Sequence, residues 1–162
     1  MKEQVSLKAQ EVKGVVESFQ GDILALLDNI VAINSYSHNT EGVAQVAQEL
    51  SEYLPSPLTL ESVRSSDDAL VWICRHLPTN EPPILLVGHL DTVFPPGSFD
   101  SGVVSQGPYL HGPGVADMKG GLVVMLGALR VLHHLNLLSN IPLVVAFNGD
   151  EEIGSAFSGH QL

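Results

Sequence analysis

The sequence has little of three things: cysteine, basic charge and long apolar runs. Its 162 residues include one cysteine, Cys74, which excludes a disulfide within the chain and fits a reducing compartment. Cys74 lies in the apolar run 70–74. We therefore interpret it as a buried and inert thiol rather than a nucleophile.

The scarcity of basic residues bears on the kind of partner. There are 7 lysines and arginines against 18 aspartates and glutamates, a formal net charge of −11. This balance argues against nucleic acid or an anionic membrane surface as a partner. Residues 1–4 are polar without a hydrophobic signal region, and no apolar stretch reaches the length of a membrane span. We therefore expect a cytoplasmic protein.

The remaining composition and the periodicity predict an ordered domain. With 44% hydrophobic and 15% charged residues, the chain is long enough and apolar enough for one domain with a core. After a polar lead-in of about 20 residues, apolar spacing predicts helices over 18–33, 40–54 (capped by Thr40) and 119–135, strands over 58–63, 69–77, 84–90 and 141–147, and a small hairpin over 103–111. This alternation predicts a layered α/β fold with a largely parallel central sheet.

The strand over 84–90 ends in chemically active residues. His89 and Asp91 are two positions apart, so in an extended chain both side chains point to the same side. In open α/β sheets, ligands bind outside the carboxyl ends of the strands. A lone histidine at a strand end is more often capped by a backbone group, so this stretch alone leaves a ligand role open.

Two further clusters occupy comparable places. Asp117 lies in a glycine-rich turn before the helix over 119–135, and Glu151 and Glu152 follow the strand over 141–147. If the two strands are neighbours, all three clusters meet at one end of the sheet. Imidazole and carboxylates suit zinc, and a carboxylate left over could act as a general base. The alternative for an acidic pair after a strand is a solvated loop.

The glycine-rich turn has a competing interpretation. Gly112 and Gly114 before a helix resemble part of a phosphate-binding loop. Asp117 occupies the expected third glycine position, where a carboxylate would repel a pyrophosphate. Dinucleotide binding is therefore disfavoured.

Three motifs carry a resemblance to a known family. Residues 88–93 read GHLDTV, residues 112–121 read GPGVADMKGG, and residues 148–155 read NGDEEIGS. In this order they resemble the M20 metallopeptidases, which include glutamate carboxypeptidases, acetylornithine deacetylases, succinyl-diaminopimelate desuccinylases and aminoacylases, and they look closest to the glutamate carboxypeptidase branch. The resemblance implies a three-layer α/β sandwich of the zinc-exopeptidase type, with a mixed, largely parallel sheet.

The resemblance also implies roles for individual residues. His89 and Glu152 would each ligate one of two zinc ions, for which cobalt could substitute, and Asp117 would bridge them. Asp91 would hydrogen-bond the other nitrogen of His89, and Glu151 would be the general base acting on water. The substrate would be a small peptide or an N-acyl amino acid, cleaved at an amide bond. A cis peptide bond between Asp117 and Met118 is implied as well.

The chain departs from the family in length. Members are more than twice as long and dimerise through an inserted domain, and two of their ligands, a carboxylate and a histidine, lie beyond the Glu-Glu motif. We therefore interpret residues 1–19 as a lead-in and 20–162 as the N-terminal portion of a truncated catalytic domain. The alternative is a non-catalytic fragment with at most weak metal or partner binding. His160, and likewise His38, His76, His133 and His134, are expected outside the site.

Overall fold

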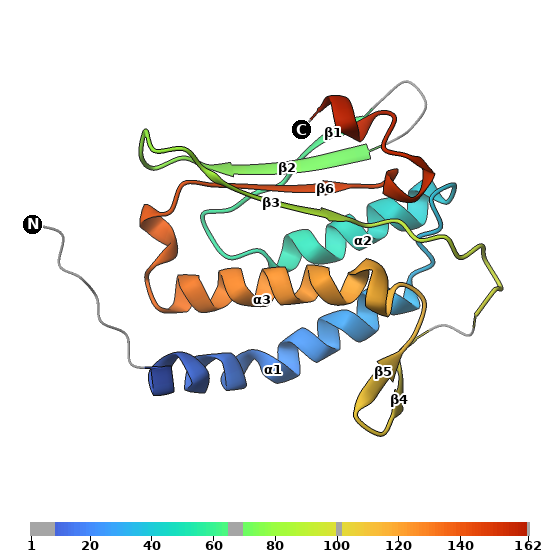
Figure 1. Cartoon of the computed structure of the whole chain (residues 1–162), viewed down its shortest axis with the longest axis horizontal. Coiled ribbons are helices and arrows are strands. Elements are labelled where there is room, and N and C mark those ends of the chain that lie inside the picture. The colour runs from blue at the N-terminus through green and yellow to red at the C-terminus, as the bar shows by residue number, and fades with distance from the viewer. Residues whose placement is uncertain (1–8, 65–69, 100–101, 162) are drawn as a thin grey trace, which may run out of the picture.

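The computed structural model describes residues 9–64, 70–99 and 102–161. A four-stranded sheet and a layer of three helices make up the body of the structure (Figure 1). A two-stranded hairpin projects beside the entrance to the third helix. The helices are α1 (Ala9–Ala32), α2 (Thr40–Tyr53) and α3 (Gly120–His134), the sheet strands are β1 (Glu61–Arg64), β2 (Leu70–His76), β3 (Ile84–His89) and β6 (Leu143–Asn148), and the hairpin strands are β4 (Val104–Gln106) and β5 (Tyr109–His111).

The sheet has the strand order β1-β2-β6-β3 and is mixed. β2 pairs antiparallel with both β1 and β6, whereas β3 and β6 run parallel. The parallel pair needs a crossover, which α3 supplies between β3 and β6. The predicted α/β fold with a mixed sheet is thus confirmed. The sheet is only partly parallel, however, because β2 runs antiparallel to both of its neighbours.

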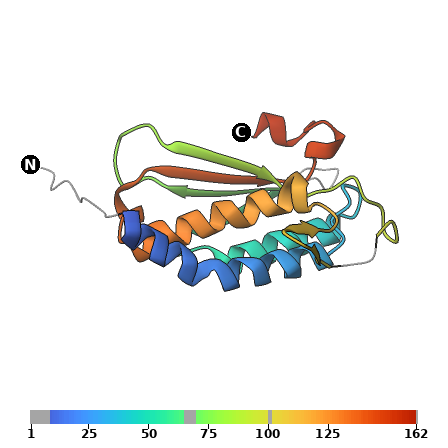
Figure 2. The ribbon, with the colours of Figure 1, turned by 60° about the horizontal axis from the view of Figure 1, so that its bottom comes forward.

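The helices all cover one face of the sheet (Figure 2). Leu122, Leu126 and Leu129 of α3 are at most 2% exposed, and they pack with α1 and the helix-facing side of β6. Burying each such leucine contributes about 1.5–3 kcal/mol. In β6, Val145 and Phe147 face this core, while the intervening residues face the opposite side of the sheet, as strand alternation requires.

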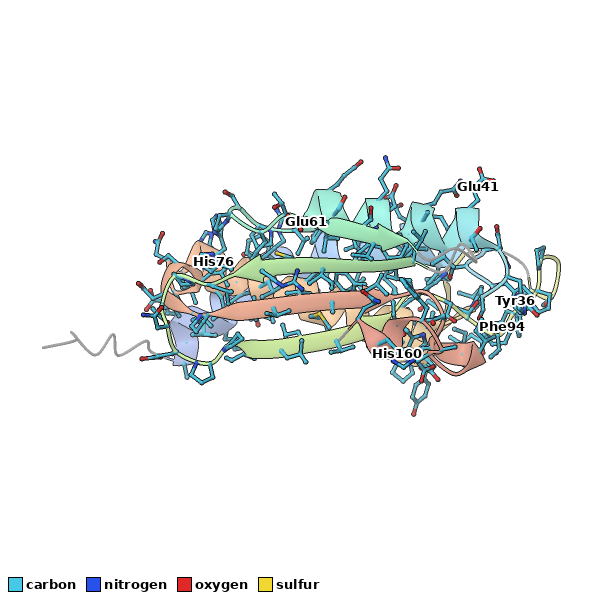
Figure 3. The ribbon with its side chains drawn as sticks, turned by 90° about the horizontal axis from the view of Figure 1, so that it is seen from above. Tyr36, Glu41, Glu61, His76, Phe94 and His160 are labelled. Atoms are coloured by element: carbon cyan, nitrogen blue, oxygen red, sulfur yellow. The ribbon has the colours of Figure 1, made fainter. Side chains whose placement is uncertain are left out.

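The opposite face of the sheet is open along β3 in the described residues, whereas parts of β2 and β6 are buried there (Figure 3). Leu85 and Val87 of β3 are 53% and 44% exposed, and Phe157 packs against a small cluster on β2 and β6. Residues 9–161, within the part that the structure describes, therefore form two layers of the predicted three-layer sandwich. No α-helix from these residues is available to cover this face.

The element ends differ from the sequence prediction in two places. α1 begins at Ala9 and so extends into the predicted lead-in, because Val12, Val15 and Phe19 continue its partly buried stripe at helical spacing. The N-cap of α2 is Asn39 rather than Thr40, since the Asn39 side chain accepts a hydrogen bond from the Gly42 amide at 3.2 Å. Within the described ranges, none of the helices combines the length and apolarity needed to cross a membrane.

Candidate active site

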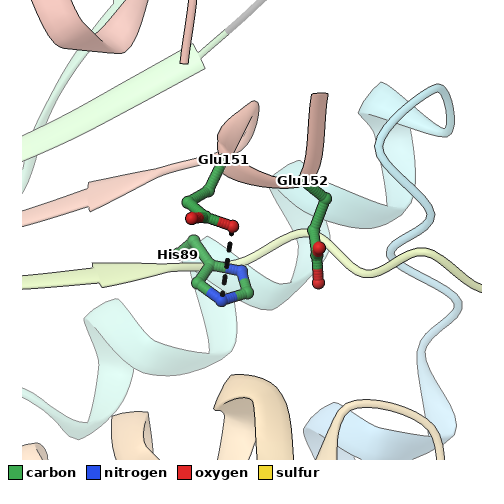
Figure 4. A group of neighbouring side chains, drawn as sticks. All are labelled: His89, Glu151 and Glu152. Atoms are coloured by element: carbon green, nitrogen blue, oxygen red, sulfur yellow. Dashed lines mark ion pairs between the residues drawn. The ribbon is translucent and has the colours of Figure 1, made fainter. Parts of the chain in front are cut away.

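The parallel pairing of β3 and β6 brings two of the three predicted clusters together. His89 stands opposite Asn148 in the register, and the Leu90 amide donates to the Asn148 carbonyl at 2.8 Å. Both strands therefore end at the same edge of the sheet. Glu151 and Glu152 follow β6 in a short 3-10 turn, and their side chains reach toward His89 (Figure 4).

The two ring nitrogens of His89 face different groups. Nδ1 lies 3.1 Å from the backbone oxygen of Asp91 and 3.4 Å from its carboxylate Oδ1. Nε2 lies 2.9 Å from Asp117 Oδ1 and 3.9 Å from Glu151 Oε2. Because the groups at Nδ1 and Asp117 at Nε2 are all acceptors, both ring nitrogens donate when no cation is bound. If the ring loses one proton to a cation, Asp91 keeps the proton on Nδ1, and the lone pair on Nε2 is free to face the cation.

The surrounding carboxylates control the charge of His89, which is 6% exposed. Burial alone would lower the pKa of its imidazole. The hydrogen bonds to Asp91 and Asp117 outweigh burial and raise this pKa from 6.5 to about 9. His89 is therefore protonated at neutral pH as long as no cation competes for Nε2.

Asp91 is the buried centre of this edge of the sheet, with 1% exposure. Its Oδ1 accepts from the Glu151 amide at 3.3 Å, and its Oδ2 accepts from the Glu152 amide at 3.1 Å and the Ser37 hydroxyl at 2.8 Å. Burial alone would raise the pKa of Asp91, but the hydrogen bonds from His89, Ser37 and Glu152 lower it. Asp91 thus touches the imidazole, as expected, and also holds the turn that carries both glutamates.

Glu151 and Glu152 complete a group that could hold a cation. One ligand atom each from His89, Glu151 and Glu152 lies within 4.8 Å of the other two. Burial raises the pKa of Glu152, the facing imidazole of His89 lowers it, and the nearby carboxylates, Asp117 first, raise it further. A divalent cation between these groups would relieve the repulsion among the carboxylates.

Asp117 reaches the cluster from the turn before α3. Its peptide bond to Met118 is cis, as the resemblance implied. Gly114 has a φ of +76°, and a side chain there would contact Thr92 at 2.8 Å, so this turn requires glycine next to the end of β3. The Asp117 side chain is 76% exposed, so it meets His89 from the solvent side.

Lys119 is a residue of this region that the sequence reading missed. It is 1% exposed, and its Nζ donates to the carbonyls of Ile30 and Ile33 at the end of α1, at 2.7 and 2.8 Å. Burial lowers the pKa of Lys119 to about 8. Its position two residues after Asp117, just before an apolar helix, was the only signal in the sequence.

The five histidines expected outside the site do not belong to this group. His76 contacts the Ser139 carbonyl at the opposite end of β2, and His133 and His134 belong to the last turn of α3. His38 meets the ring of Tyr36 edge to face, and His160 is exposed. The predicted site residues His89, Asp91, Asp117, Glu151 and Glu152, in contrast, converge on one edge of the sheet.

Comparison with known proteins agrees with this geometry. Residues 85–161 match the profile of the family described as "Peptidase family M20/M25/M40". Carboxypeptidase G2 of Pseudomonas sp. (strain RS-16) is 30% identical over 146 residues, covering 84% of this chain and 34% of that protein. The N-formyl-4-amino-5-aminomethyl-2-methylpyrimidine deformylase of Halalkalibacterium halodurans is 28% identical over 157 residues, covering 91% and 36%.

The fold is shared with solved structures. Human carnosine dipeptidase 1 superimposes with a TM-score of 0.77 at 18% identity, covering 91% of this chain and 36% of that one. The chain thus spans about a third of the length of the relatives it matches. Residues 85–161 therefore match the M20 peptidase family, and the resemblance carried by the three motifs within this range is confirmed.

Proposed function

We propose that this chain provides the metal-binding edge of an M20-type hydrolase that cleaves an amide bond in a small peptide or an N-acyl amino acid. The observation that supports this most strongly is the orientation of His89. Asp91 lies against Nδ1, Nε2 faces the carboxylates of Asp117 and Glu151, and Glu152 belongs to the same group of possible ligands. This is how a histidine is prepared to bind a metal ion.

The donor set fits zinc. One imidazole nitrogen and carboxylate oxygens are ligands that zinc takes at catalytic sites, which have three protein ligands and an open position. The ligand atoms of His89, Glu151 and Glu152 lie close enough that small side-chain rotations would bring them around one ion. From the family we infer that two zinc ions would be held here, with cobalt as a possible substitute, and that Asp117 would be one of the residues that hold them. When bound, zinc lowers the pKa of water and polarises a carbonyl.

The chain's own residues would divide the remaining work. Asp91 keeps the proton on Nδ1 of His89 and fixes the ring. Glu152 and Asp117 supply ligand oxygens. Glu151 is half-exposed and lies 3.9 Å from Nε2 of His89, so its carboxylate can reach both the cluster and an approaching substrate. We assign it the role of taking a proton from water and passing it to the leaving amine.

The openness of the site favours a second candidate function. The side chains of Asp117 and Glu151 are 76% and 51% exposed, whereas catalysis depends on a site that excludes water and holds the reacting groups within a fraction of an ångström. Taken alone, the chain would then be a non-catalytic fragment that binds a metal weakly. The two candidates share the same metal site and differ in turnover.

Further features of the whole protein follow the same inference. We propose that residues 20–162 correspond to the N-terminal portion of the catalytic domain and that full-length relatives form homodimers through another domain. We also infer a cytoplasmic location, because the sole cysteine, Cys74, is a buried free thiol.

Calorimetric titration with zinc tests the metal site. We expect binding in the micromolar range or weaker, an order-of-magnitude figure for a site with few protein ligands. Glu152→Gln should weaken it at least tenfold, because the substitution removes a ligand oxygen. Glu52→Gln, at an exposed position on α2, removes the same charge elsewhere and should leave it unchanged. Equal affinity in the two variants would contradict this site.

A further inference from the structure

The loop that follows α1 is tied to the chain just after β3. Tyr36 forms a parallel bridge with Thr92, whose amide donates to the Ser35 carbonyl at 2.8 Å. The Ser37 amide in turn donates to the Thr92 carbonyl at 3.2 Å. Asn34 adds a side-chain hydrogen bond to the carbonyl of Phe94 at 3.0 Å. This loop therefore has a fixed position relative to Asp91.

Within this loop, the hydroxyl of Ser37 points at the Asp91 carboxylate. The donor–acceptor distance is 2.8 Å, and the two residues are 5% and 1% exposed. Among the hydrogen bonds to the Asp91 carboxylate, this one has the shortest distance. A short bond between fully buried partners is a strong constraint on the direction of the carboxylate.

The four contacts of Asp91 match the capacity of a carboxylate. Its two oxygens offer about four lone-pair directions. Oδ1 takes His89 Nδ1 and the Glu151 amide, and Oδ2 takes Ser37 and the Glu152 amide. Because one rigid group accepts all four, a rotation that improves one contact spoils another. Ser37 is the only one of the four donors that lies outside β3 and the glutamate turn.

We propose that Ser37 is a positioning residue for the metal site. Through Asp91, its hydroxyl sets the ring of His89 and the backbone of Glu151 and Glu152 at once, although it touches no residue that we assign as a ligand. This inference rests on the proposed function for its purpose. The structural link from Ser37 to the Glu152 amide can nevertheless be measured without any metal.

Ser35 offers a matched control two residues away. It is 0% exposed, and its hydroxyl has no hydrogen-bond partner among the residues that the structure describes. Ser35→Ala and Ser37→Ala therefore remove the same buried atom from the same loop. Only the second removes a contact to Asp91. Ser37→Thr retains the hydroxyl and tests for rescue.

The experiment compares these variants by nuclear magnetic resonance of the metal-free protein and by zinc calorimetry. Relative to Ser35→Ala, Ser37→Ala should shift the amide proton of Glu152 upfield and speed its exchange with solvent. It should also lower zinc affinity about tenfold, the usual effect of losing a group behind a ligand. Ser37→Thr should restore both readouts.

The outcomes separate the two claims. If the wild type binds no zinc, the proposed function fails, and the Glu152 amide alone decides the role of Ser37. An unchanged Glu152 amide in Ser37→Ala would overturn that role even if zinc affinity fell. If Ser37→Ala does not fold, Ser37→Cys keeps nearly the same volume with a weaker donor and should give the same changes in smaller measure. A Cys variant identical to the wild type would then overturn the role.

Discussion

Replacing Asp91 with asparagine should destabilise the protein in a pH-dependent way. The amide keeps the shape of the carboxylate but turns one acceptor oxygen into a donor. In the wild type, the Glu152 amide donates to Oδ2 at 3.1 Å. If the new NH2 group of the asparagine takes the place of Oδ2, it can donate to the Ser37 oxygen, but it faces the Glu152 amide, which is also a donor and loses its acceptor. One buried amide left unpaired costs about 1–3 kcal/mol.

The lost charge adds a second effect of similar size, which is present below the folded-state pKa of His89. Raising the pKa of His89 from 6.5 to about 9 is equivalent to about 3 kcal/mol of stability for the protonated ring. Part of this comes from Asp117, whose exposed carboxylate is screened by solvent, so we assign about 2 kcal/mol to Asp91. A group with a raised folded-state pKa stabilises fully below its unfolded pKa and loses that contribution as the pH rises through the folded value. The cost of Asp91→Asn should therefore be about 3–5 kcal/mol at pH 6 and about 1–3 kcal/mol at pH 9.5.

Urea unfolding of the wild type and Asp91→Asn at pH 6, 7.5 and 9.5 measures this difference. Asp22→Asn, at an exposed position on α1, removes the same charge and should cost little at any pH. The titration of Lys119 affects the wild type and the variant equally and so cancels in the comparison. A cost of Asp91→Asn that is the same at pH 6 and 9.5 would refute the pairing between His89 and Asp91.

Three other outcomes are expected. His89 is protonated below its pKa of about 9, and zinc must displace that proton to bind. The zinc affinity measured by calorimetry should therefore rise about tenfold per pH unit below this pKa and level off above it. An affinity that does not change with pH would mean that zinc binds elsewhere. The chain alone should not measurably hydrolyse folate-type or N-acyl amino acid substrates with added zinc or cobalt, and turnover that disappears in Glu151→Gln would show that the open site suffices. Burial lowers the pKa of Lys119 to about 8, so between pH 8 and 10.5 the unfolded chain binds more protons than the folded one. The free energy of unfolding should therefore rise with pH over that window. Urea unfolding of Lys119→Met should show no such rise.

The sequence was sufficient to predict which residues meet at the site. His89 and Asp91 end one apolar strand, Glu151 and Glu152 follow another, and glycines surround Asp117. Motifs at strand ends and helix entrances are local, so their meeting follows once the two strands are parallel neighbours. That part of the prediction needed only the order of the elements.

Contacts between residues far apart in the chain could not be predicted from the sequence. The bond from Ser37 to Asp91 joins residues 54 positions apart, and the bonds from Lys119 to the end of α1 span more than 80. Serine in a polar loop and lysine at a helix entrance are ordinarily solvated, so their burial depends on how the elements pack. The direction of β2 was not predicted for a related reason, since strand pattern alone does not specify whether neighbours are parallel.

The end of α1 and the loop that follows it position both parts of the cluster, the one around Asp91 and the one around Asp117, although they contain none of the candidate ligands. The loop after α1 holds Asp91 through Ser37, and Asp91 holds His89 and the glutamate turn. The last carbonyls of α1 hold Lys119, which fixes the turn carrying Asp117. Both connections start from the C-terminal end of α1, so the contacts within this chain are enough to place all the candidate ligands relative to one another. They do not exclude water from the site, since the Asp117 side chain remains 76% exposed. We therefore expect this chain to bind a metal ion without turning over substrate. Metal binding depends on the contacts with the end of α1, and turnover depends on shielding Asp117 from water.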